Sequence, residues 1–219
     1  MGGIAIARWA TFDCYGTLID WQAGIRAELA RVFGEDRADD QLARYHELEP
    51  ELQSTGQLSY REVMTEAMRH LGAPAGEEEG LAESLPSWNP FPEVAAALED
   101  LWRRGWQLAI LSNSDRDLIA ASKDRIGVPF DQTVVAQEIR SYKPAFRHWE
   151  EFSARSGADP KRHVHVAASL FHDIVPASAL GLPTVWINRL KETAGRVRPT
   201  RELADLSELP DLLDELLPE

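Results

Sequence analysis

The stretch WATFDCYGTLIDW, residues Trp9 to Trp21, organises the rest of the chain. A mostly apolar run over residues 4–12 ends at a lone carboxylate, Asp13. The run is continuous rather than alternating, which is typical of a strand in a parallel sheet covered on both faces. A charged side chain at the end of a buried strand is costly, and open α/β sheets bind ligands at such ends. The pattern predicts a functional carboxylate at Asp13, or, more simply, an aspartate that caps a turn.

Four later segments also carry polar residues at or near the end of an apolar run. They are LAILSNSD (Leu108–Asp115), SYKPA (Ser141–Ala145), VAASLFHD (Val166–Asp173) and GLPTVWINR (Gly181–Arg189). Together with the first stretch, and in this order, they resemble the motifs of the haloacid dehalogenase superfamily. The last segment is similar to a signature of its 2-haloacid dehalogenase branch. The resemblance covers nearly the whole chain and implies that Asp13 is a nucleophile at the tip of the first strand.

From residue 92 onward, expected strands and helices alternate. We expect strands at residues 106–112, 133–136, 163–169 and 183–188, with helices at 94–104, 115–126, 144–156 and up to 180 between them, and a C-terminal amphipathic helix. Strands that alternate with helices form right-handed βαβ units. The fold class predicted is α/β, a doubly wound parallel sheet with a Rossmann-like core.

The segment between the first strand and this alternation shows no strand signal. Asp20 is expected to cap a helix that ends at Gly34, and helical spacing of apolar residues continues to about residue 87. We therefore expect a small all-helical cap inserted after the first strand. The predicted domains are residues 1–20 and 88–219 for the core and 21–87 for the cap.

The amino-acid composition and net charge of the chain limit the classes of partner that it is expected to bind. The 219 residues are 44% hydrophobic and 27% charged, as in an ordinary globular protein, and the formal net charge is -13. That charge repels phosphate backbones and anionic lipid, so neither nucleic acid nor a membrane is expected as a partner. A small anionic substrate remains possible because a few placed cations control a pocket.

The single cysteine, Cys14, allows no internal disulfide and suits a reducing compartment. The N-terminus lacks the charged and then apolar pattern of a signal peptide, and no apolar run is long enough to span a membrane. We therefore expect a cytoplasmic protein. Relatives in the branch that the chain resembles are often dimers, so a homodimer is a further expectation.

Four residues form the expected catalytic set: Asp13, Thr17, Lys143 and Asp173. The ends of parallel strands meet at one edge of a sheet, so these side chains are expected to converge there. Asp13 would attack carbon and form an ester. Thr17 would fix the angle of the carboxylate, Lys143 would keep it ionised, and Asp173 would hold Lys143 or activate water. Simpler roles stay open: a turn residue for Thr17, a surface lysine for Lys143 and a helix-start aspartate for Asp173.

Tyr15 separates two reaction classes. Phosphatases of the superfamily that the chain resembles carry an aspartate two positions after the nucleophile, and it protonates the leaving alkoxide. A phenol with a pKa near 10 does this poorly, whereas a halide leaves without a proton. Asp173 also lacks the acidic neighbour that such phosphatases use to hold magnesium, so we expect neither a metal ion nor a cofactor.

Substrate contacts are expected from both parts of the chain. Arg44 falls where the resemblance implies a substrate-binding arginine, which would grip a carboxylate or accept the halide; an exposed helix arginine is the alternative. Tyr45 and His46 are second candidates. Ser112 and Asn113 precede a helix whose N–H groups can hold an anion, although simple capping is possible too.

Three further candidates mark departures from the 2-haloacid dehalogenases. Trp149 stands where they carry a tyrosine six residues after the lysine. An asparagine that would orient the catalytic water is missing from the fourth motif, and Ser169 or His172 is a possible substitute. These departures put the substrate range and the rate in question more than the reaction type.

The function expected from the sequence is hydrolysis of (S)-2-haloacids to 2-hydroxy acids and halide through an aspartyl ester. The partners would be a small anionic 2-haloacid and the released halide. Two alternatives stay open: a magnesium-dependent phosphatase with an atypical acid position, and a non-catalytic binding protein on the same fold.

Overall fold

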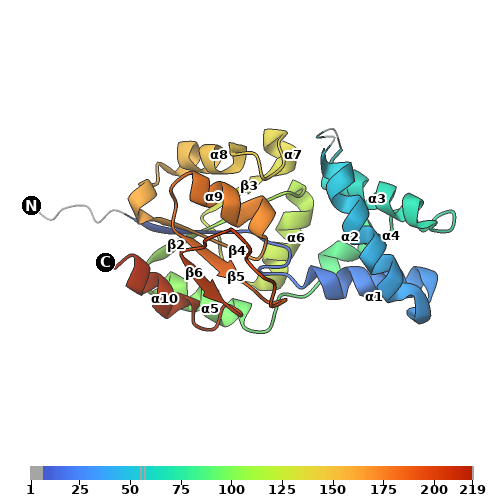
Figure 1. Cartoon of the computed structure of the whole chain (residues 1–219), viewed down its shortest axis with the longest axis horizontal. Coiled ribbons are helices and arrows are strands. Elements are labelled where there is room, and N and C mark those ends of the chain that lie inside the picture. Colours follow the sequence, from blue (N-terminus) through green and yellow to red (C-terminus); the bar gives the residue numbers. More distant parts are fainter. Residues whose placement is uncertain (1–6, 55, 57, 219) are drawn as a thin grey trace, which may run out of the picture.

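The fold, a computed structural model that describes residues 7–54, 56 and 58–218, is built on a six-stranded sheet (Figure 1). All its strand pairs are parallel, in the order β3-β2-β1-β4-β5-β6. The strands are β1 (Arg8–Phe12), β2 (Trp106–Ser112), β3 (Gln132–Val135), β4 (His163–Ala167), β5 (Thr184–Ile187) and β6 (Arg201–Leu203). The predicted parallel sheet is confirmed. Residues 4–6 of the expected first strand lie outside the described residues.

The register of the central strands sets the position of the nucleophile candidate. β1 lies between β2 and β4, and its last residue, Phe12, pairs with Ile110 on one side and with Val166 on the other. All five residues of β1 are buried. Asp13 therefore leaves the sheet in the middle of its carboxyl edge, between the ends of two neighbouring strands.

Helices cover both faces of the sheet. Figure 1 shows α8 (Arg147–Ser156) and α9 (Val175–Ala179) over one face, and α5 (Val94–Arg103) and α10 (Leu209–Leu216) over the other. The remaining core helices are α6 (Arg116–Ile126) and the short α7 (Ala136–Ile139). Burial on both faces explains the continuous apolar runs of the central strands.

A second, all-helical layer follows β1, and we call it the cap (Figure 1). It consists of α1 (Trp21–Phe33), α2 (Ala38–Ser54), α3 (Tyr60–Leu71) and α4 (Gly80–Ser84), with the 3₁₀ turns η1 (Glu35–Arg37) and η2 (Leu85–Ser87). Asp20 caps α1 as predicted, because its carboxylate accepts the Ala23 N–H at 3.1 Å. The predicted helical insertion after the first strand is confirmed; the domain limits stay a prediction.

Three local features differ from the sequence expectations. β6 was not expected, because three residues with mostly exposed side chains carry no readable pattern. The helix expected from Pro144 begins at Arg147, and the Lys143–Pro144 peptide bond is cis. Asp173 lies in a π-helical turn, η4 (Leu170–Ile174), ahead of α9. A further 3₁₀ turn, η3 (Pro160–Arg162), precedes β4.

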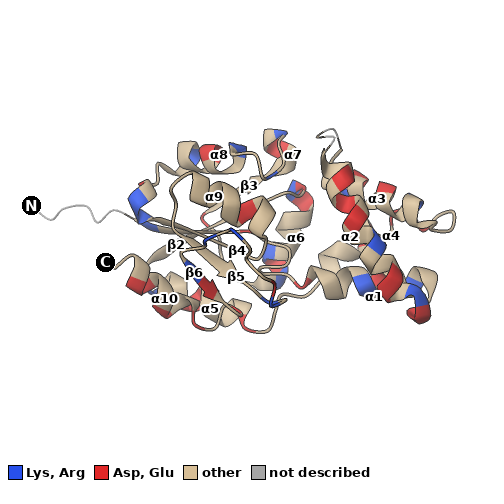
Figure 2. Ribbon diagram, viewed as in Figure 1, with Lys and Arg blue, Asp and Glu red and all other residues tan. Residues whose placement is uncertain are grey.

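Charge is spread over both layers. Figure 2 shows acidic residues along α2 and α10, and charges of both signs on α1. An anionic ligand would therefore need local cations at its site rather than an attractive surface. Within the described ranges, no helix has the length and apolar character needed to cross a bilayer.

Candidate active site

A cavity of about 540 Å³ opens between the carboxyl edge of the sheet and the cap. This volume is within the usual range for small-molecule sites. Residues from the core and from α1, α2 and α3 of the cap line it together. The core side includes Asp13, Tyr15, Ser112, Asn113, Lys143, Ser169, His172, Asp173 and Arg189, and the cap side Trp21, His46, Glu49, Pro50, Gln53 and Tyr60.

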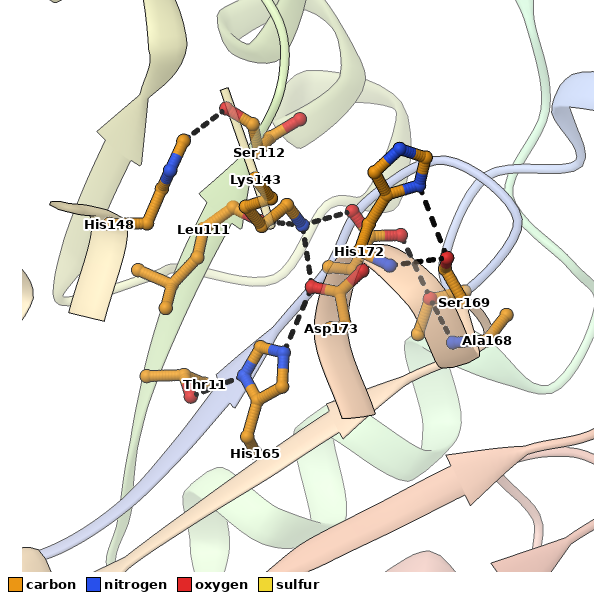
Figure 3. A network of polar contacts seen from close by, with 12 residues as sticks. Thr11, Leu111, Ser112, Lys143, His148, His165, Ala168, Ser169, His172 and Asp173 are labelled. Carbon is orange, nitrogen blue, oxygen red and sulfur yellow. Dashed lines mark hydrogen bonds and ion pairs between the residues drawn. The ribbon is translucent and has the colours of Figure 1, made fainter. Parts of the chain in front are cut away.

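Lys143 joins the two carboxylates at the floor of this cavity (Figure 3). Its Nζ donates to Asp13 Oδ1 at 2.8 Å, to Asp173 Oδ1 at 2.6 Å and to the Leu111 carbonyl at 2.8 Å. All three ammonium hydrogens therefore have acceptors. The side chains of Lys143 and Asp173 are 1% exposed, whereas that of Asp13 is 12% exposed. Asp13 is thus the more accessible of the two carboxylates.

Thr17 fixes the other oxygen of Asp13. Its hydroxyl donates to Asp13 Oδ2 at 3.1 Å and accepts the Ala168 backbone N–H at 2.9 Å. Because Oδ1 is held by Lys143 and Oδ2 by Thr17, the plane of the Asp13 carboxylate has little freedom to turn. This small network joins the end of β1, which Asp13 follows, to the end of β4, which Ala168 follows.

The pKa values of the two carboxyl groups in this cluster shift in opposite directions. Burial alone would raise the pKa of Asp173, but Lys143 and His165 outweigh it and hold that pKa at about 2. Burial raises the pKa of Asp13 above its ordinary value of 3.8, although Lys143 opposes the shift, and Asp173 adds to it. Burial opposes the charge on Lys143, but the two carboxylates raise its pKa. Lys143 therefore stays an ammonium, and Asp173 is its permanent partner.

A chain of buried polar groups runs from Asp173 into the sheet (Figure 3). His165 Nε2 lies 3.0 Å from Asp173 Oδ1, and Thr11 Oγ1 lies 2.9 Å from His165 Nδ1 and 2.7 Å from His163 Nε2. Burial lowers the pKa of His163 to about 3, so this ring is neutral. The sequence analysis did not identify His165 as a positioning residue. The signal was present in HVHVAAS, where the two histidines of a buried strand share one face.

The hydroxyl of Tyr15 is bonded to core helix α6 and not to Asp13. The Tyr15 Oη lies 3.1 Å from Ser122 Oγ on α6, and the ring packs against Tyr60 and Trp88. Burial raises the pKa of this phenol well above 10. Its ring lines the cavity, but its hydroxyl is engaged elsewhere, so the position two residues after Asp13 offers no ready proton.

Ser112 and Asn113 lie where β2 ends, and both line the cavity. The side chain of Asn113 makes two hydrogen bonds to the backbone of Lys143. Its Oδ1 accepts the Lys143 N–H at 2.6 Å, and its Nδ2 donates to the Lys143 carbonyl at 3.0 Å. The Ser112 carbonyl lies 3.0 Å from His148 Nε2. Asn113 therefore joins two motif loops.

Ser169 and His172 also line the cavity, on the side of η4. Ser169 Oγ accepts the His172 backbone N–H at 3.1 Å and lies 3.2 Å from His172 Nδ1. Burial lowers the pKa of His172 below its ordinary value. The pair is therefore a neutral polar patch beside Asp173.

With this geometry in hand, comparison with known proteins identifies the family. The family model for haloacid dehalogenase-like hydrolases matches residues 7–181. This chain belongs to that family. The (S)-2-haloacid dehalogenase H-109 of Pseudomonas putida is 29% identical to it, over 92% of this chain and 96% of the relative. The (S)-2-haloacid dehalogenase of Pseudomonas sp. strain YL is 31% identical over 81% of each.

The fold comparison agrees. The structure of the L-2-haloacid dehalogenase from Xanthobacter autotrophicus superposes with a TM-score of 0.83 and covers 95% of this chain and 98% of that one. At 19% identity this likeness establishes the fold alone. The chain is thus a haloacid dehalogenase-like hydrolase with an α/β core and a helical cap.

Three residues expected to contact substrate do not line the cavity of this hydrolase: Arg44, Trp149 and the second candidate Tyr45, which is buried in the hydrophobic core. Arg44 is exposed, and its guanidinium donates to Gln41 Oε1 and to the His70 carbonyl. It lies two residues from His46, so the helical period turns it to another side of α2. Trp149 lies on α8 and is buried against the face of the sheet, where its ring packs edge-on against the ring of His165 at a centroid distance of 5.1 Å.

Other residues of the cap line the cavity in place of Arg44. His46, Glu49, Pro50 and Gln53 share the face of α2 that lines the cavity, and of these the sequence analysis named only His46. Their spacing of three and four residues was readable, but which face of α2 meets the core was not. Arg189 was quoted within a motif without a role, and it lines the cavity from the loop after β5.

The residues of this site do not fit a magnesium ion. Asp13 and Asp173 both engage the Lys143 ammonium. Among the residues that the structure describes, no group of three or more His, Cys, Asp or Glu side chains is placed to hold a metal ion. Magnesium is usually held by one or two ionised carboxylates together with water, and here the Lys143 ammonium already neutralises both carboxylates.

Proposed function

We propose that this hydrolase releases halide from (S)-2-haloacids through an ester on Asp13. One observation carries the proposal: Asp13 is held by Lys143 and Thr17 at the cavity floor while the Tyr15 hydroxyl is bound to Ser122. A fixed carboxylate without a neighbouring proton donor suits a leaving group that departs as an anion. The relatives named (S)-2-haloacid dehalogenases support this substrate class.

The first step is displacement at carbon. An Asp13 oxygen attacks the carbon that bears the halogen from the rear, the C–O bond forms, and the C–X electron pair leaves with the halide. Lys143 stabilises the attacking carboxylate as an ion, and Thr17 holds its angle. Rear-side attack inverts this carbon, so an (S)-acid gives a product of opposite configuration.

Arg189 is the best candidate to bind the substrate carboxylate, in the role first assigned to Arg44. Its guanidinium stacks 3.6 Å from the centre of the Phe91 ring. Its hydrogen bonds to the described chain, to Glu93 and to the Thr17 carbonyl, come from Nη2. Nη1 is therefore free to meet an anion in the cavity, and Ser112 supplies a hydroxyl on the opposite side of Asp13.

The second step is hydrolysis of the ester. Asp173 Oδ2 is buried and has no hydrogen-bond partner among the described residues, whereas Oδ1 is saturated by Lys143 and His165. We assign Oδ2 the task of orienting the water that attacks the side-chain carbonyl of Asp13. The neighbouring Ser169–His172 pair takes the place of the asparagine missing from the fourth motif.

The test is a halide-release screen over chloro-, bromo- and fluoroacetate and both enantiomers of 2-chloropropionate, with and without a chelator. We expect release from the (S)-enantiomer that the chelator does not affect. A single turnover in ¹⁸O-water should label Asp13 before the product, and Asp13→Asn should be inactive but folded.

Two results would replace the proposal. Magnesium-dependent release of phosphate from aryl phosphates, without halide release, would establish the phosphatase alternative. Protection of Asp13 and Lys143 by a ligand that is never turned over would establish a binding protein. Label that appears in the product but never in Asp13 would exclude the ester.

A further inference from the structure

Glu49 places a carboxyl group on the cap side of the cavity, although an acid there faces the acidic Asp13. It lies on α2, which contributes His46 and Gln53 to the same wall. Its Oε1 accepts two hydrogen bonds, from Tyr60 Oη at 2.8 Å and from Gln53 Nε2 at 3.3 Å. The bonds to Oε1 leave Oε2 without a partner at ordinary hydrogen-bond geometry among the described residues, and the buried hydroxyl of Tyr45, on the same helix, lies beside this carboxyl. One oxygen is thus an acceptor, and the other is left to carry a proton.

We propose that Glu49 is a neutral carboxylic acid whose Oε2–H donates a hydrogen bond to the halide as it leaves carbon. The proposal rests on the dehalogenase function proposed above and adds the group that receives the leaving halide. Glu49 would be a catalytic residue in the strict sense, because it would touch the departing atom.

The direction of rear-side attack places the leaving halide near the cap side of the cavity, where Glu49 lies. In rear-side attack the nucleophile, the carbon and the leaving group lie on one line. Asp13 attacks from the end of β1 in the core, so the halide moves away from the sheet and toward the cap. The cap side of the cavity is formed by α1, α2 and α3, where Glu49 and Tyr60 supply polar groups.

Arg44, which the sequence analysis expected to receive the halide, and Asn113, which lines the cavity, are not available as donors. Arg44 is outside the cavity, and Asn113 Nδ2 uses its two hydrogens on the Lys143 carbonyl at 3.0 Å and on Gln53 Oε1 at 3.5 Å. The Lys143 ammonium has its three acceptors. A halide at the cap therefore needs another donor, and a protonated carboxyl group supplies one.

The surroundings of Glu49 favour the protonated form. Burial raises the pKa of Glu49 to about 7, the hydrogen bonds of Tyr60 and Tyr45 oppose the shift, and Asp13 adds to it. The titratable groups around it are Tyr45 and His46 on α2, Tyr60 on α3, and Asp13, Lys143 and Tyr142 from the core. An ionised Glu49 would repel both the substrate and the halide, whereas the neutral acid attracts them.

The proton is not transferred in the step. The Asp13 oxygen forms its bond to carbon, the carbon–halogen bond breaks, and the electron pair leaves as halide. Glu49 keeps its proton and shares it in a charge-assisted hydrogen bond. Because chloride and fluoride are stronger acceptors than bromide, the contribution of Glu49 should grow in that direction.

The kinetic test is the dependence of kcat/KM on pH for the wild type and for variants at this wall. We expect activity to fall above about pH 7 in the wild type, as Glu49 ionises. Glu49→Gln keeps an N–H donor and cannot ionise, so this decline should vanish. Glu49→Ala should lose about 10- to 100-fold, the usual effect of a hydrogen bond to a charged group. Tyr60→Phe removes a bond that lowers the pKa, so its decline should move to higher pH.

Two controls separate Glu49 from its neighbours. Glu47→Gln makes the same charge change on an exposed position of α2 and should leave the profile unchanged. Burial lowers the pKa of His46, so His46→Gln should keep the decline in kcat/KM above about pH 7, whatever its effect on the size of kcat/KM. A decline that persists unchanged in Glu49→Gln would overturn the proposal.

A second measurement does not need turnover. Bromide binding can be followed by tryptophan fluorescence, because Trp21 lines the cavity and packs 5.0 Å from the His46 ring. We expect wild-type affinity for bromide to fall about tenfold between pH 6 and pH 8, and that of Glu49→Gln to stay constant. Bromide affinity that is independent of pH in the wild type would refute the role of Glu49. The expected bromide behaviour in a protein that releases no halide from any acid would refute only the dehalogenase function.

Discussion

The carboxylate of Asp115, at the start of core helix α6, accepts the backbone N–H of Tyr60, the first residue of cap helix α3, at 3.0 Å. Its other oxygen accepts the Arg61 N–H at 2.9 Å. Asp115 makes no side-chain capping bond to its own helix. A residue of the second motif thus completes the N-terminus of a helix in the other layer, next to the Tyr60 side chain that holds Glu49.

The first prediction concerns this contact between core and cap. Asp115→Ala leaves two N–H groups at the start of α3 without an acceptor, so we expect a loss of about 1–3 kcal/mol in the free energy of unfolding. The cap should also open more often. Faster hydrogen exchange at the amides of Tyr60 and Arg61 and a raised KM would be the direct readouts.

The matched control for Asp115 is Asp117→Asn. Asp117 pairs with the Arg61 side chain at 2.7 Å on the exposed surface, and such pairs contribute little. We expect a change below about 0.5 kcal/mol and no change in KM. Equal effects of the two substitutions would show that Asp115 does not hold the cap in place.

The second prediction concerns the Lys143 cluster. Lys143→Met leaves Asp13 and Asp173 buried beside each other without a cation, and breaking a buried pair in this way typically costs about 3–5 kcal/mol. Asp173→Asn added to it removes one of the two charges, so the double variant should be more stable than Lys143→Met alone. Urea unfolding of Lys143→Met, Asp173→Asn and the double variant measures the coupling; strictly additive losses would mean that the cluster is not a unit.

The third prediction is the pH dependence of stability caused by Glu49. The pKa of Glu49 is about 7 in the folded protein and 4.5 as an ordinary value. Between these values the folded protein keeps a proton that the unfolded chain has lost, so stability falls as the pH rises through this window. At about 1.36 kcal/mol per pKa unit, the full loss is about 3 kcal/mol and is complete above pH 7.

Glu49→Gln isolates that effect. The difference in unfolding free energy between wild type and Glu49→Gln should change across pH 4.5 to 7, whereas the difference for the exposed Glu47→Gln should stay level. A flat difference for Glu49→Gln would mean that its folded pKa is ordinary. This measurement is independent of any substrate.

These cases also indicate how much the sequence determined. The strand WQLAILS has the bounds expected for it, because Gly105 and the SNSD turn close a continuous apolar run. The proximity of Lys143 to Asp13 across 130 residues followed from the rule that parallel strands end at one edge. Local patterning and topology were sufficient for these features.

The features that the sequence did not reveal depend on how the two layers meet. Arg44 and Glu49 lie on the same amphipathic helix, and no local pattern said which would face the core. Asp115 was read as the neighbour of its own helix, whereas its partners are 54 and 55 residues away. Such contacts are set by tertiary packing, which local propensity does not encode.

The last prediction compares the two arginines as carboxylate-binding groups. Arg189 lines the cavity and Arg44 does not. Arg189→Lys keeps the charge and loses the planar fork, so we expect KM for a haloacid to rise about 10- to 100-fold, with a smaller change in kcat. Arg44→Lys should change neither parameter by more than about twofold, because an exposed cation is screened by solvent. Thermal unfolding of Arg189→Lys checks that its pair with Glu93 persists. A raised KM in Arg44→Lys alone would mean that the cap turns Arg44 into the cavity when substrate binds. Arg44 on α2, and not Arg189, would then be the group that binds the carboxylate of the substrate.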